Sequence, residues 1–275
     1  MRSGEPLAFR AFKYAVYLLL SVNVAYFFYE SAAAAEYVFR EGVSPAEMIV
    51  AFSAPVDSMA WLVLLLLLEV ETAVLEDRIS PRSKRIIAVA TAICYAVILY
   101  SFYGYIKTLE VPAGFSTYDG PSPCARAGEG ASIAIDLERF EPLTSTNCAS
   151  LGAGALHNAA LDIFASADAF AMLRRLAWLD VANSGLWLIV VTALEAEVRL
   201  KASPSFGTKA YAAFKAAKGA LYAALFLVAA DWARLGSPWD AWDAFLWLAA
   251  FFFIELNLFS WQKDRAALRG TVSSR

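Results

Sequence analysis

Six runs of about 20 mostly apolar residues constrain this chain more than any other feature of its sequence. A helix of roughly 20 residues crosses a bilayer core about 30 Å thick. The composition agrees, because 60% of the residues are hydrophobic and only 18% are charged, which is too apolar for a soluble domain of this length. We therefore expect an all-α integral membrane protein with six transmembrane helices. The expected spans are 10–29, 58–76, 86–106, 181–199, 210–230 and 243–261.

Lys and Arg residues gather at alternate ends of these spans. Basic residues are retained in short cytoplasmic loops, and here they precede the first span, join the second to the third and the fourth to the fifth, and follow the sixth. The two short connections on the opposite side hold only Arg40 and Arg234. This pattern predicts a multi-pass protein of a bacterial inner membrane with both termini in the cytoplasm. A cleaved signal peptide ending at the small residues 31–35 is the alternative to a retained first helix.

Three of the six spans share one pattern of polar and aromatic residues. An Asp or Asn is followed after four positions by Trp, eight positions later by Glu, and two positions later by Glu or Asn. The copies are Asp57, Trp61, Glu69 and Glu71; Asn183, Trp187, Glu195 and Glu197; and Asp243, Trp247, Glu255 and Asn257. All three copies lie on even-numbered spans. The chain is therefore expected to contain three pseudo-repeated helical hairpins, arranged about an axis along the membrane normal.

The repeated acids suggest a path for ions. Carboxylates inside a bilayer are costly and mark ion paths, proton relays or ligand sites, and rings of acids select for cations. We expect one Glu from each copy to form a ring on the repeat axis, with the next acid or amide facing adjacent helices or making a second layer. The predicted pathway consists of Glu69, Glu195, Glu255, Glu71, Glu197 and Asn257. The first residue of each copy would form an outer vestibule: Asp57, Asn183 and Asp243.

A structural interpretation of the same residues stands beside the functional one. Glu195 and Glu197 have Arg199 and Lys201 four positions later, the spacing of helical ion pairs. Basic residues on odd-numbered spans, such as Lys218, would reach other acids from adjacent helices. The first residue of each copy would then be an N-cap, and Trp61, Trp187 and Trp247 would belong to the aromatic belt at the membrane interface. Under this interpretation the protein is a membrane scaffold or accessory subunit.

Ser-Pro pairs mark several expected helix starts. Ser at the cap and Pro in the first turn favour helix initiation. The pairs begin at Ser44, Ser80, Ser203 and Ser237. At the first of them Glu47 completes a capping box.

The long connection between the third and fourth spans is the one expected extramembrane region. It divides the chain into transmembrane residues 1–106, an outer loop 107–178 and transmembrane residues 179–275 with a short tail. Cys124 and Cys148 both lie in this loop, where an oxidising compartment would join them as a disulfide. The Ala-rich half, 155–178, is expected to form a helix on the outer surface. A loop this long indicates a surface that binds a periplasmic or membrane protein partner.

Most enzyme chemistry is excluded by what the sequence lacks. It has one histidine, His157, which we expect to be solvated, and it has no phosphate loop, no zinc-type Cys spacing and no nucleophile elbow. We therefore expect no catalytic activity, no cofactor and no metal site. Scattered basic residues and a net charge of −3 exclude a nucleic-acid partner. The expected partners are the lipid bilayer, cations or protons, a partner protein, and further copies of this chain if six helices are too few to enclose a pore.

Overall fold

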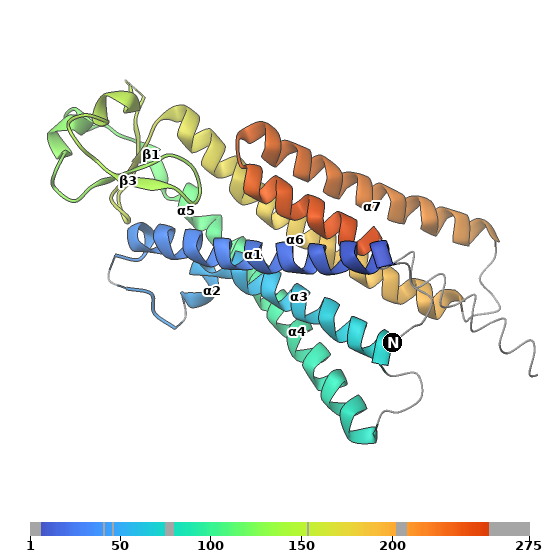
Figure 1. Cartoon of the computed structure of the whole chain (residues 1–275). Helices are drawn as coiled ribbons and strands as arrows, with labels where there is room; N and C mark the ends of the chain where they lie inside the picture. Colours follow the sequence, from blue (N-terminus) through green and yellow to red (C-terminus); the bar gives the residue numbers. More distant parts are fainter. Residues whose placement is uncertain are drawn as a thin grey trace, which may run out of the picture. The chain divides into compact units, whose positions relative to one another are not determined.

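The computed structural model describes residues 7–40, 42–45, 47–74, 80–152, 154–201 and 208–252, and most of them are helical (Figure 1). Within these residues five helices are long and apolar enough to cross a membrane, and they overlap the first five predicted spans. Their crossing segments are Arg10–Val38, Ser53–Val70, Pro81–Ala113, Ala167–Glu197 and Lys209–Leu235. The protein is thus a polytopic membrane protein, as the sequence predicted.

The chain divides into two compact units, and two long helices contribute to both. Among the described residues, unit 1 contains 21–189 and unit 2 contains 7–20 and 190–252. Helix α1 (Leu7–Val38) passes from unit 2 into unit 1, and helix α6 (Ala167–Lys201) passes back.

Unit 1 is built on helices α2 (Met48–Ala51), α3 (Ser53–Val74), α4 (Pro81–Thr108) and α5 (Glu110–Ala113), together with its parts of α1 and α6. Helix α3 packs along α4, and α2 packs against α4 at Gly104. A Cβ atom on Gly104 would lie 2.7 Å from the carbonyl oxygen of Ile49, so only glycine permits this approach.

Two of the predicted helix starts in unit 1 show their capping contacts. Ser80 Oγ accepts a hydrogen bond from Ser83 N at 3.2 Å. Helix α4 begins at Pro81, directly after Ser80. The Glu47 carboxylate accepts hydrogen bonds from Ser44 Oγ at 2.6 Å and from Ser44 N at 3.0 Å, and these bonds lower the pKa of Glu47. The helix that follows Glu47 is only four residues long.

Unit 2 contains α7 (Thr208–Leu235) and a last helix that starts at Pro238, as the Ser-Pro pair predicted. Gly236, with φ 84°, makes the turn between them. The last helix is described through residue 252, and the rest of the sixth predicted span, 243–261, lies outside the described residues.

A five-stranded sheet between α5 and α6 corrects the all-α expectation. Its strands are β1 (Phe115–Thr117), β2 (Ser132–Ala134), β3 (Phe140–Pro142), β4 (Leu156–Asn158) and β5 (Ile163–Ala165). They lie in the order β1-β4-β5-β2-β3, with β2 and β5 parallel and the other pairs antiparallel. We call residues 114–166 the sheet domain. It lies at the C-terminal end of α4 and the N-terminal end of α6, and we call these ends the sheet end of the two helices (Figure 1).

The helix expected on the outer surface at 155–178 is wrong. Its first part forms β4 and β5, and its second part is the beginning of α6. The run Ile163, Phe164, Ala165 is completely buried, because β5 lies inside the sheet between β4 and β2. Ser166 Oγ then accepts from Ala169 N at 3.1 Å, which caps the first turn of α6.

The sheet domain has a hydrophobic core of its own. Seven buried residues form it, and Tyr118 packs against them. The seven are Ala131, Ile133, Leu143, Cys148, Leu151, Ala155 and Phe164. The domain is therefore a folded body rather than an extended loop.

Candidate functional site

The structure describes two of the three Glu residues that the sequence predicted to form a ring. Glu69 lies on α3 in unit 1 and is partly exposed, whereas Glu195 lies on α6 in unit 2 and is exposed. Glu255, the third, lies outside the described residues, as do Asn257 and the side chain of Glu71. The ring stays a prediction.

Glu197 forms a buried ion pair between α6 and α7. Its Oε2 accepts from Lys218 Nζ at 2.8 Å, and the two side chains are only 7% and 10% exposed. Lys218 is one of the basic residues that the structural interpretation had named. The proposed helical partner of Glu197, Lys201, has its side chain outside the described residues, as has Arg199. At Glu197 the geometry fits pairing between helices rather than an open ion path.

The residues that open the repeated pattern are not N-caps. Asp57 is the fifth residue of α3, because that helix already begins at Ser53. Asn183 lies in the interior of α6, and Asp243 lies in the interior of the last helix. Asp57 is 7% exposed, and its Oδ2 accepts a long hydrogen bond of 3.5 Å from the Tyr105 hydroxyl on α4.

The three repeated Trp residues do not form an aromatic belt at the lipid surface. Trp61, Trp187 and Trp247 are between 6% and 8% exposed, so their rings pack inside the protein. Trp61 and Trp187 contact each other, with ring centroids 6.3 Å apart. Three other tryptophans are exposed, as belt residues are: Trp178, Trp239 and Trp242.

Two acids that sequence reasoning passed over lie toward the sheet end of unit 1. Glu30 on α1 and Asp180 on α6 are both partly exposed. The Tyr26 hydroxyl donates to Glu30 Oε1 at 3.1 Å. Each acid lies one residue outside an expected span, 10–29 or 181–199, and so neither was counted as intramembrane. The spacing of Tyr26 and Glu30 by one helical turn was the available signal.

Buried hydroxyl groups accompany the acids of unit 1. Ser101 on α4 is completely buried, and Ser184 on α6 is 2% exposed. Neither Oγ atom has a hydrogen-bond partner among the described residues. Ser184 follows Asp180 by one helical turn, so the two side chains share a face of α6.

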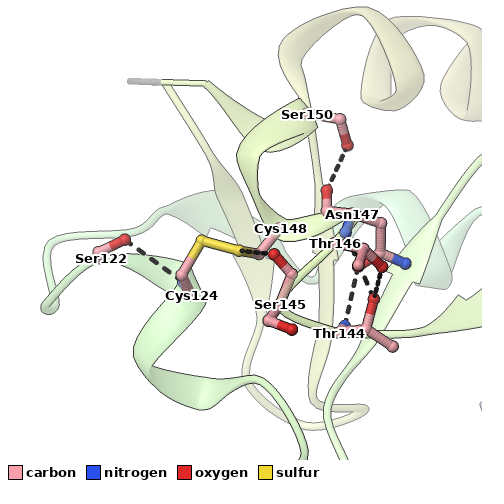
Figure 2. The surroundings of a disulfide bond; sticks show 8 residues. All are labelled: Ser122, Cys124, Thr144, Ser145, Thr146, Asn147, Cys148 and Ser150. Atoms are coloured by element: carbon pink, nitrogen blue, oxygen red, sulfur yellow. Dashed lines mark hydrogen bonds between the residues drawn. A yellow bond between two sulfur atoms is a disulfide. The ribbon is translucent and has the colours of Figure 1, made fainter.

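The predicted disulfide is confirmed. Cys124 and Cys148 join two short 3₁₀ helices, Pro123–Arg126 and Cys148–Leu151, with their Cα atoms 5.1 Å apart (Figure 2). Hydrogen bonds stiffen the chain on both sides of the bridge. Ser122 Oγ accepts from Cys124 N at 3.3 Å, and Asn147 Oδ1 accepts from Thr144 N at 2.8 Å (Figure 2).

His157 is not solvated as expected. Its side chain is 14% exposed, its ring stacks on Phe164 at 4.2 Å between centroids, and its Nε2 lies 3.0 Å from Asp162 Oδ1. The antiparallel register of β4 and β5 places His157 opposite Phe164. Asp162 also binds Arg126 Nη2 through both carboxylate oxygens, at 3.2 and 3.1 Å.

Arg40 ties the segment after α1 to the same corner of the sheet domain. Its guanidinium donates to the carbonyl oxygen of Gly130 at 2.6 Å, to Ser132 Oγ at 3.0 Å and to the carbonyl oxygen of Asp162 at 3.2 Å. These contacts hold the sheet domain to the segment that follows α1, although the two are far apart in the sequence.

Within the part of the chain that the structure describes, no group of three His, Cys, Asp or Glu residues is arranged to hold a metal ion. Comparison of the chain with protein-family models, with curated proteins and with solved structures finds no match.

Proposed function

We propose that the protein is a membrane scaffold or accessory subunit whose sheet domain binds a partner protein outside the bilayer. The observation that carries this proposal is the folded state of the domain, with its own core and the Cys124–Cys148 bridge. A connection between two membrane helices needs only a few residues, so a folded insertion of this size indicates a binding role.

The charge of the inserted region indicates the chemistry of the partner. Residues 107–166 contain seven acidic and three basic side chains. Four of the acids are exposed: Glu110, Asp119, Glu129 and Glu141. Charge complementarity steers association and selects partners. The partner is therefore a protein with a basic surface.

The orientation proposed with this function follows from the charged loops. The basic residues that precede the first span, join the second to the third and the fourth to the fifth, and follow the sixth favour a sheet domain outside the cytoplasm and both termini inside it. The disulfide supports this orientation, because disulfides persist in oxidising compartments. The proposed location is a bacterial inner membrane, with the six helices as three repeated hairpins.

Photo-cross-linking tests the proposal. A benzophenone amino acid at position 116, an exposed position in β1, should give one discrete cross-linked protein in cells. Reversing two exposed acids, Asp119→Lys with Glu141→Lys, should reduce that product at least fivefold. The control reversal Asp240→Lys, outside the sheet domain, should leave it unchanged. Equal cross-linking in all three proteins, or no discrete product at all, would contradict the proposal.

A cation or proton channel or transporter is the second candidate. It is favoured by the burial of acids on unit 1 helices, where Asp57 is 7% exposed, since intramembrane carboxylates are expensive and mark ion paths. Glu69, Glu195 and Glu255 would carry the ion, and several copies of the chain would assemble if one bundle encloses no pore. Cation and proton flux into proteoliposomes should be lost when all three become Gln while the protein stays folded. Unchanged flux in the triple variant would exclude this pathway.

A further inference from the structure

We infer that the partner protein adds an extended segment, with basic residues beside it, as a further strand on the free edge of β1. The inference rests on the proposed function, because it describes how the sheet domain binds the partner proposed above. In this mode of binding, backbone hydrogen bonds supply the contact and side chains beside the strand supply the selectivity.

The sheet has two edge strands, β1 and β3, because the strand order is β1-β4-β5-β2-β3 (Figure 1). Each edge strand turns a row of backbone N–H and C=O groups away from its neighbour. Such a row pairs readily with an extended segment of another chain unless the protein blocks it. The two edges of this sheet differ in that respect.

The edge at β3 is blocked. Leu143 N donates to the carbonyl oxygen of Ala131 at 2.8 Å, so the backbone groups of Leu143 face the β2 side. Backbone groups alternate along a strand, and those of Pro142 therefore point outward. Proline has no N–H, and the carbonyl oxygen of Pro142 already accepts from Asn147 Nδ2 at 3.0 Å. An edge proline of this kind prevents the addition of a strand.

The edge at β1 has the opposite character. Tyr118 N donates to the carbonyl oxygen of Ala155 at 3.0 Å, which continues the antiparallel register of β1 and β4. The backbone groups of Ser116, two residues earlier, therefore also face β4. Those of Phe115 and Thr117 point away from the sheet by the same alternation.

Within the part of the chain that the structure describes, no hydrogen bond occupies the outward N–H and C=O groups of Phe115 and Thr117. The side chains of Ser116 and Thr117 are exposed, so an added strand has access to this edge. The sequence of β1, Phe-Ser-Thr, contains no proline and no charged residue that would oppose pairing. The edge at β1 is therefore open to a further strand.

The charge beside this edge indicates the charge of the added segment. Residues 108–125 contain no Lys or Arg, whereas Glu110 and Asp119 flank β1 and are exposed. Glu110 is bound by Lys107 at 2.5 Å, so the charge of Asp119 dominates next to the strand. Charge complementarity therefore favours a segment with Lys or Arg beside Asp119.

A second copy of this chain is a poorer occupant of the same edge. Pairing two β1 strands would bring together two sheet domains, and residues 107–166 of each carry seven acidic and three basic side chains. Like charges across an interface oppose association. A basic segment of another protein meets no such repulsion.

Thr117→Pro tests the inference in cells, with the benzophenone amino acid at position 116 of the full-length protein. Proline removes the outward N–H of residue 117 and leaves the hydrogen bonds to β4 intact, as Pro142 does in β3. The yield of the cross-linked partner should fall about fivefold or more. The matched control Thr117→Val keeps this N–H and should leave the yield unchanged.

Hydrogen exchange gives a second measurement, which stays informative if Thr117→Pro impairs folding. It compares the purified cross-linked complex with the free protein in detergent, at single-residue resolution. The amides of Phe115 and Thr117 should exchange about tenfold or more slowly in the complex, because an added strand accepts their hydrogen bonds. The amide of Tyr118, already bonded to Ala155, should change little.

The inference is overturned if folded Thr117→Pro protein gives the wild-type yield, or if both outward amides exchange equally fast in the complex and the free protein. The proposed binding of a partner protein would survive either result. A cross-linked product with twice the mass of this chain would also overturn the inference, because a second copy would then occupy the edge. Absence of any discrete product in the protein without edge variants would overturn the proposed function and this inference with it.

Discussion

Two sets of acids, one in each unit, show two different environments of a carboxylate on a long helix. Glu197 in unit 2 is buried and paired with Lys218 at 2.8 Å, so its charge is neutralised by the protein. Glu30 and Asp180 in unit 1 are partly exposed, and no described Lys or Arg forms an ion pair with them. The comparison teaches that burial and the neighbouring group, rather than the place of an acid in a repeated sequence pattern, decide whether it pairs helices.

Removing the countercharge of Glu197 is the change with the largest expected effect. Lys218→Met should destabilise the protein by about 3–5 kcal/mol, because it leaves a buried carboxylate without its partner. Thermal unfolding in detergent measures the loss. The double variant Glu197→Gln with Lys218→Met should regain most of it, while the single variant Lys215→Met, at an exposed lysine of α7, should change little. If the Lys218→Met protein is as stable as the wild type, the ion pair with Lys218 does not stabilise the buried Glu197.

The corresponding change in unit 1 should have the opposite sign. Asp180→Asn relieves repulsion from Glu30 and should raise stability at neutral pH by about 1 kcal/mol in choline buffer. Unfolding of the two proteins in the same buffer checks this. A clear loss of stability in Asp180→Asn would mean that the carboxylate is needed by a partner group of the protein.

A smaller effect should follow at Asp57, which accepts a hydrogen bond from Tyr105. Tyr105→Phe removes a donor that lies 3.5 Å from Asp57 Oδ2, a long and weak bond. The expected loss is about 0.5 kcal/mol, at the low end for a buried hydrogen bond. Chemical unfolding of the variant beside wild type measures it. A loss as large as that of Lys218→Met would show that this bond is the main support of Asp57.

The smallest effect should come from the sheet domain. Arg139 lies on the hairpin between β2 and β3, where its side chain is 61% exposed and is bound to Asp136. Asp136 Oδ1 keeps backbone hydrogen bonds from Glu138 N at 3.1 Å and Arg139 N at 2.9 Å when the guanidinium is removed. Arg139→Gln should therefore cost less than about 0.5 kcal/mol, measured by thermal unfolding. A loss as large as that of Lys218→Met would show that the Arg139–Asp136 pair is a main support of the sheet domain.

The apolar runs sufficed to predict the five long apolar helices among the described residues, because the length and composition of a membrane span depend mainly on the bilayer. The ends of the helices were harder to predict. Helix α1 continues past residue 29 to Val38, and α6 begins at Ala167, well before residue 181. The Ala-rich stretch after Glu30 and the helical turns that precede Asp180 form helix without being strongly apolar. The predicted hydrophobic spans therefore stopped before the end of α1 and started after the beginning of α6. Glu30 and Asp180 were not counted among the intramembrane acids for this reason.

The sheet domain was predicted as a region but not as a fold. The positions of Cys124 and Cys148 predicted the disulfide, because the two lie in one outer loop. The strands have only three residues each, too few to establish a period of two in the sequence. His157 lay among small residues and seemed exposed, whereas its burial depends on the pairing of β4 with β5.

The order of the strands has a consequence for the biogenesis of the protein. Strand β1 pairs with β4, so that Phe115 lies opposite Asn158, and β2 pairs with β5 just before α6 begins. Apart from the hairpin of β2 and β3, no strand pair can form until the chain has been synthesised as far as residue 158, and the sheet is complete only at residue 165. Helices α1 to α5 are made before that point, and α6 follows it directly. The sheet domain is thus expected to complete its folding late, while the ribosome is already supplying the next membrane segment.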